Sequence, residues 1–203
     1  RYGLIAFASS LDQIGPMARS VEDVSIMLTV ISGYDDKDST SLDIEIPPYH
    51  EKIYERMETF RFGVLKEEEF EGIDEEVYKA YKDTLDLMEK LGGKKVYIEL
   101  PHLKYSIYVY YILATSEASS NLARYDGVRS GMRVEGEDIL TLYNSTRSKG
   151  FGREVKRRIL LGTFSLSAGY YRAFYGKASI VRKLIKNDFD RAFKDVNFIV
   201  IPT

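Results

Sequence analysis

Apolar residues recur at helical spacing in two early segments of the chain. The first segment starts at Ser20, whose hydroxyl suits a helix N-cap, and its apolar positions run up to Gly33. The second starts at Asp74 and carries apolar residues every three or four positions up to the glycine pair at 92–93. Glycine closes both patterns, so we predict an amphipathic helix in each segment.

Shorter runs have the apolar or alternating pattern of strands. They are FRFGVL at 60–65, KVYIEL at 95–100 and VNFIVIP at 196–202, and residues 3–7 are predicted as a further terminal strand. The first two runs enclose the helix that begins after Asp74. We therefore expect a βαβ unit and, with it, a parallel pair of strands.

A long region between the second and the last predicted strand has mainly helical periodicity. It runs from 105 to 194, with breaks near 125–137 and at 150–152. There is no internal repeat and no low-complexity linker. The pattern therefore indicates one α/β layer structure with a helical insertion between strands.

Two adjacent arginines stand within this region, in the segment EVKRRILLGTFSLSAGYYRAFYGKAS at 154–179. Neighbouring helical residues are about 100° apart, so Arg157 and Arg158 cannot point the same way. The positions that share a face with Arg158 are Phe151, Val155, Gly162, Ser165 and Gly169. Arg157 is therefore predicted to be solvated, whereas Arg158 needs a partner on a close-packed face. An internal Asp or Glu and the carboxylate of a ligand both fit a guanidinium.

Composition narrows the classes of function. The chain has 203 residues, of which 44% are hydrophobic and 30% charged, as in ordinary globular proteins. A formal charge of -2 gives no basic surface for a polyanion, and the uncharged run 159–171 is too short to span a bilayer. There is no cysteine and there are only two histidines, so we expect no disulfide, thiol nucleophile or structural zinc. No leader pattern is visible, which is compatible with a cytoplasmic protein.

Common catalytic motifs give no match. The G-x-S-x-G elbow, the phosphate loop and the dinucleotide fingerprint are all missing from the sequence. The Tyr78–Lys82 spacing resembles a Tyr-x-x-x-Lys pair, but it falls on a charged helix that we expect to be solvated. His50 and His102 are predicted as surface residues, and Glu117 as a satisfied polar residue beside serines rather than a base.

Three blocks of sequence resemble the amidase signature family. They are GLIAFASSLDQIGPMARSVED at 3–23, SEASSNLARYDGVRSG at 116–131, and RSKGFGREVKRRILLGTFSLSAGYY at 147–171. The first block is similar to amidases in general. The other two resemble the A subunits of the bacterial tRNA-dependent amidotransferases, and the resemblance extends over essentially the whole chain.

The resemblance implies an α/β fold, a mixed sheet covered by helices, of which residues 1–203 form part of a single amidase domain. The family uses a Ser-cis-Ser-Lys triad, and these residues are expected upstream of Arg1, with a further substrate-binding acid expected downstream. The chain alone is therefore expected to be inactive and to contain no catalytic residue. By resemblance, Tyr110 and Arg158 are the residues that bind glutamine.

The resemblance also implies partners. The A subunit hydrolyses glutamine, and the ammonia passes to a B subunit that uses ATP and Mg²⁺ to convert Glu-tRNA(Gln) to Gln-tRNA(Gln), while a C subunit joins the two. Contact with tRNA is expected mainly through the B subunit, and no cofactor is expected in this chain. The alternatives are a stand-alone amidase for another small amide and a catalytically empty assembly module.

Overall fold

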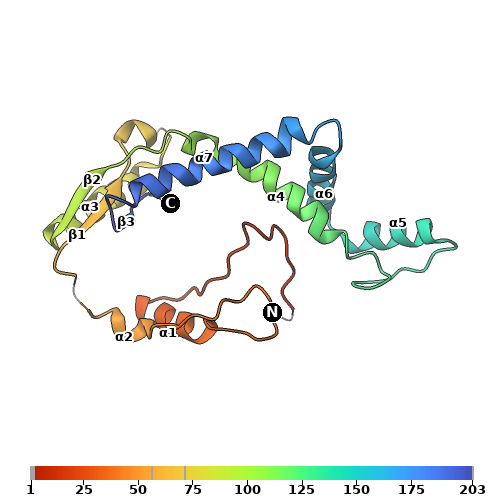
Figure 1. Ribbon diagram of the computed structural model, residues 1–203, viewed down its shortest axis with the longest axis horizontal. Helices are drawn as coiled ribbons and strands as arrows, with labels where there is room; N and C mark the ends of the chain where they lie inside the picture. The colour runs from red at the N-terminus through yellow and green to blue at the C-terminus, as the bar shows by residue number, and fades with distance from the viewer. Residues whose placement is uncertain (1–2, 56, 71, 203) are drawn as a thin grey trace.

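The computed structural model describes residues 3–55, 57–70 and 72–202, and a three-stranded parallel sheet lies at one end of the molecule (Figure 1). Its strands are β1 (Phe60–Val64), β2 (Gly93–Tyr97) and β3 (Phe198–Ile199), in the order β2-β1-β3. Phe60 lies opposite Gly93, and Phe62 lies opposite Phe198. The predicted α/β class is confirmed, and so is the parallel pair of the βαβ unit.

Helices cover both faces of the sheet. On one face, Phe62 and Val64 pack with Tyr81 and Leu85 of α3 (Glu75–Lys90), whose N-terminus is capped by Asp74 as predicted. On the other face, a second apolar cluster reaches α7 (Lys177–Ala192). Its buried members are Leu65, Ile98, Leu100, Ala192 and Val196. The sheet is therefore the middle layer of three.

The predicted helical insertion lies between β2 and β3. It consists of the short turn η2 (Leu103–Tyr105), α4 (Ser106–Leu122), α5 (Ile139–Gly150), α6 (Arg153–Leu166), the π-helical turn η3 (Arg172–Gly176) and α7. Both predicted breaks are confirmed, before α5 and between α5 and α6. The helices α4 and α6 cross closely, because a Cβ built on Gly162 would lie 1.9 Å from the carbonyl oxygen of Thr115.

The first two helices lie apart from the sheet (Figure 1). They are α1 (Val21–Ile31), which Ser20 caps as predicted, and α2 (Tyr49–Lys52); the short turn η1 (Glu67–Phe70) follows β1. The apolar side of α1 is largely open, with Val30 77% exposed. Within the described part of the chain, no helix combines the length and the hydropathy needed to cross a membrane.

The strand predicted at 3–7 is wrong, because these residues form a loop. The backbone N–H groups of Phe7 and Ala8 donate to the carboxylate of Asp12, each at 2.9 Å, and so do not join a strand ladder. The strand predicted at 95–100 begins earlier and ends at Tyr97. The strand predicted at 196–202 is reduced to the two residues of β3.

Candidate functional site

Arg158 lies on the packed side of α6. Its side chain is 25% exposed, against 59% for Arg157. Along the predicted stripe Val155 is half-buried, and Gly162 and Ser165 are buried. The predicted difference in exposure between the two arginines is therefore confirmed.

Glu154, one turn earlier on α6, binds both arginines. Arg158 donates from Nε to Glu154 Oε1 at 2.8 Å, while Arg157 donates from Nε and a terminal nitrogen at 2.8 and 2.7 Å. Hydrogen bonds from Arg157 first, and then from Arg158, lower the pKa of Glu154 from 4.5 to about 2. The carboxylate is thus ionised at neutral pH. Glu154 is therefore an internal acidic partner for Arg158, which was one of the two partners that the sequence analysis considered.

Tyr110 and Phe7 complete the surroundings of Arg158. Hydrogen bonding with Glu154, and then with Tyr110 of α4, raises the pKa of Arg158. The guanidinium carbon also lies 5.6 Å from the centre of the Phe7 ring, within the range of a cation–π contact. The structure therefore brings the two residues proposed from the sequence together. Sequence reasoning missed Phe7, since no local pattern connects the first loop with α6.

The chemistry of these three side chains suits a small carboxylate. The guanidinium supplies several N–H donors, of which Glu154 engages the one on Nε, and the tyrosine supplies a hydroxyl. Phe7 covers one side of the guanidinium with an apolar ring. The arrangement can hold and orient an anionic group. Within the described residues, no cluster of three or more His, Asp or Glu side chains is placed to hold a metal ion.

The surface prediction for His50 and His102 holds only in part, because both are intermediate in exposure and Nδ1 of His50 is buried with no hydrogen-bond partner in the described part of the chain. His102 Nδ1 lies 2.9 Å from Asp188 Oδ2, its backbone N–H donates to the same oxygen at 2.9 Å, and Arg191 binds the other oxygen. Burial of Asp188 would raise its pKa, but these hydrogen bonds leave the pKa lowered. His102 therefore joins the loop after β2 to α7. The side chain of His50 is 42% exposed.

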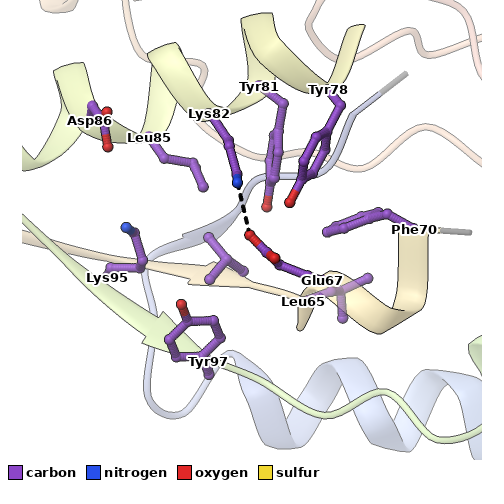
Figure 2. A pocket seen from close by; sticks show the side chains of 11 residues that line it. Leu65, Glu67, Phe70, Tyr78, Tyr81, Lys82, Leu85, Asp86, Lys95 and Tyr97 are labelled. Carbon is purple, nitrogen blue, oxygen red and sulfur yellow. Dashed lines mark ion pairs between the residues drawn. The ribbon is translucent and has the colours of Figure 1, made fainter. Parts of the chain in front are cut away.

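A separate pocket of about 280 Å³ lies beside the carboxyl ends of β1 and β2 (Figure 2). In it Lys82 Nζ lies 3.0 Å from Glu67 Oε1 and 4.8 Å from the centre of the Tyr78 ring. The hydrogen bond with Glu67 raises the pKa of Tyr78. The side chain of Lys82 is 53% exposed, so the prediction of a solvated position holds for the lysine, while Tyr78 is half-buried. A tyrosine with a raised pKa is poorly suited to proton transfer at neutral pH.

Comparisons with known proteins identify the family of this chain. The family model for amidases matches residues 1–203. The chain is 56% identical, over all of its length, to the A subunit of the glutamyl-tRNA(Gln) amidotransferase of Thermodesulfovibrio yellowstonii, and 56% identical to that of Carboxydothermus hydrogenoformans. It spans 42% of the length of each of these relatives.

Solved structures give the same result. The A subunit of the glutamyl-tRNA(Gln) amidotransferase of Thermotoga maritima matches all of this chain and 39% of its own, with a TM-score of 0.72 and 38% identity. A bacterial aryl acylamidase of the amidase signature family matches 93% of this chain and 37% of its own, with a TM-score of 0.66. At 14% identity, this second likeness shows the fold alone. The chain therefore belongs to the amidase family.

Proposed function

We propose that this chain is part of the glutaminase subunit of a tRNA-dependent amidotransferase. The subunit hydrolyses glutamine and supplies ammonia for the conversion of Glu-tRNA(Gln) to Gln-tRNA(Gln). The observation that carries the proposal is the position of Arg158 on the packed side of α6, the helix that packs against α4, which carries Tyr110. The 56% identity to subunits of that name supports it.

Arg158 grips the α-carboxylate of glutamine in this proposal. Glu154 holds the guanidinium through Nε and fixes its orientation, so that the remaining donors face the ligand. Tyr110 adds a hydroxyl to the same anion, and Phe7 covers the guanidinium. Pre-organised donors bind a carboxylate with little loss of side-chain entropy on binding.

The remaining parts of the reaction are assigned outside this chain. Residues 1–203 would form part of a single amidase domain whose two serines and lysine lie in another segment. A B subunit would use ATP and Mg²⁺ and carry most of the tRNA contact, and a C subunit would join the complex. We assign no cofactor to this chain and place the complex, a ligase, in the cytoplasm.

The test uses the full-length subunit in its assembled complex. Arg158→Ala should raise the KM for glutamine about ten- to 150-fold, because a charge-assisted hydrogen bond is lost. Arg157→Ala is the matched control and should change KM little, since its side chain is 59% exposed. Tyr110→Phe should raise KM about two- to tenfold.

Amidation that uses added ammonia separates binding from folding. It bypasses glutamine, so it should survive in each variant that folds. Arg158→Lys keeps the charge and loses the planar fork, and should recover part of the affinity. A fall in ammonia-dependent activity parallel to that with glutamine would make Arg158 a structural partner of Glu154. High glutaminase activity of the subunit without its partners and tRNA would favour a stand-alone amidase.

A further inference from the structure

We infer that Glu117 of α4 and Arg182 of α7 lock Ser10 in place, and that this lock positions Phe7 against the guanidinium of Arg158. We call these three residues, Ser10, Glu117 and Arg182, the Ser10 lock. The inference rests on the proposed function, because it gives the lock a role in binding glutamine. It makes Glu117 and Arg182 positioning residues that act through Phe7.

All three polar atoms of Ser10 take part in the lock. Its backbone N–H donates to Glu117 Oε2 at 2.8 Å, and its hydroxyl donates to Glu117 Oε1. Arg182 donates to the same hydroxyl at 2.6 Å and to the backbone oxygen of Ser10 at 2.7 Å. A carboxylate and a guanidinium thus hold one serine from two different helices. Hydrogen bonds that involve charged groups are roughly twice as strong as neutral ones.

The rest of the loop is fixed to the same helix and to itself. Asn121, one turn after Glu117 on α4, donates from Nδ2 to the backbone oxygen of Phe7 at 3.0 Å and to the hydroxyl of Ser9 at 2.9 Å. Asp12 accepts hydrogen bonds from the backbone of Phe7 and Ala8. The loop therefore has a defined conformation, although it belongs to no helix or strand.

The position of the lock explains its connection with Arg158. α4 carries both Glu117 and, about two turns earlier, Tyr110. It crosses α6 close to Gly162, which lies one turn after Arg158. The loop is anchored to α4 at Ser10, and Phe7, three residues before, reaches the guanidinium on α6. Asn121 still holds the backbone of Phe7 when Ser10 is released, so the loop should loosen and the ring that covers Arg158 should become more mobile.

The experiment uses the full-length subunit in its complex, with Glu117→Ala and Arg182→Ala as the variants. Lys183→Ala is the matched control, because it removes an exposed positive charge from the next residue of α7. Two quantities are measured: hydrogen exchange of the backbone amides of residues 7–12, and the kinetics of glutaminase activity. Exchange should become faster in both lock variants and stay at the wild-type rate in Lys183→Ala.

In the same two variants the KM for glutamine should rise about two- to thirtyfold, the range expected for loss of a cation–π contact. The kcat should change less than KM, and ammonia-dependent amidation should persist. Glu117→Gln keeps an acceptor for Ser10, so its KM should lie between those of the wild type and Glu117→Ala.

Three results would overturn the inference. Unchanged exchange at residues 7–12 in both lock variants would show that the lock does not order the loop. Faster exchange with an unchanged KM, while Arg158→Ala does raise KM, would show that the loop does not serve Arg158. If Arg158→Ala itself leaves KM unchanged, the proposed function has failed and the role of the lock in that site fails with it.

Discussion

A single carboxylate, that of Glu154, sets the orientation of two neighbouring arginines. Arg157 and Arg158 leave the helix in different directions, yet both donate to Glu154, which lies three and four residues before them. Such pairs are within reach on one helix because residues at these spacings are neighbours on its surface. Arg158 is the more buried of the two arginines, so Glu154 holds its side chain in position. With Arg157, Glu154 forms a salt bridge on the surface.

This arrangement predicts a dependence of stability on pH. The pKa of Glu154 falls from 4.5 in its ordinary state to about 2 in the folded state, so its ionised form stabilises the fold above about pH 4.5. That contribution is lost as the pH falls towards about 2. The difference in unfolding free energy between the wild type and Glu154→Gln should therefore shrink over this range, as measured by urea unfolding of the full-length subunit. A difference that stays constant from about pH 5 to 2 would contradict the assignment.

At the scale of elements, the crossing of α4 and α6 depends on one small residue. The backbone of Thr115 comes very close to Gly162. A methyl group added at Gly162 would lie 1.9 Å from the carbonyl oxygen of Thr115 and 2.5 Å from its carbonyl carbon. A backbone group on a neighbouring helix cannot swing away as a side chain can. The two helices carry Tyr110 and Arg158, so the distance between these side chains is set at the crossing.

Gly162→Ala should therefore destabilise the protein, although alanine favours helix by about 1 kcal/mol. We expect a net loss of about 1–3 kcal/mol from overpacking, measured by urea unfolding, together with a higher KM for glutamine. Gly150→Ala is the control, because its added methyl would lie 3.6 Å from Met132 in ordinary contact. Equal stability of the two variants would show that the helices can separate at no cost.

Local signals predicted these elements well, and long-range contacts could not be predicted. Ser20 and Asp74 cap their helices as the sequence indicates, since a cap depends on residues one turn away. The contact between Phe7 and Arg158, and that between His102 and Asp188, join segments whose meeting depends on the whole fold. The loop at 3–7 has the composition of a strand, but the carboxylate of Asp12 accepts from the backbone N–H groups of Phe7, at its end, and of Ala8.

On the scale of the whole molecule, the chain exposes much more surface than a compact protein of its size. Its accessible surface is 15306 Å², whereas a compact monomer of 23.3 kDa exposes about 9,700 Å². Part of the excess is apolar, as on α1, where Val21 and Val30 are 72% and 77% exposed. The relatives are more than twice as long, and we propose that the rest of the amidase domain covers these faces.

The isolated chain 1–203 should accordingly be poorly stable. We expect a broad thermal transition, weak near-ultraviolet circular dichroism and binding of an apolar dye, because the open faces bury too little surface to offset chain entropy. The full-length subunit is the control and should melt sharply. A reversible two-state transition of the isolated chain at high concentration would refute this expectation.

The central position of β1 has a consequence for biosynthesis. On one side β1 pairs with β2, which follows it after the single long helix α3. On the other side β1 pairs with β3, which follows only after the whole helical insertion. Arg61 and Asn197, which join β1 to the start of β3 by a hydrogen bond, are 136 residues apart in the sequence. At about 5–20 residues per second, the ribosome needs about 7–27 seconds to bridge that interval. Through this time the nascent chain presents an unpaired apolar strand edge, the feature most prone to wrong association. The insertion thus leaves this edge of β1 unpaired for longer than the edge that meets β2. Ribosome-bound chaperones should therefore be found on nascent chains that have passed β1 and not yet reached β3.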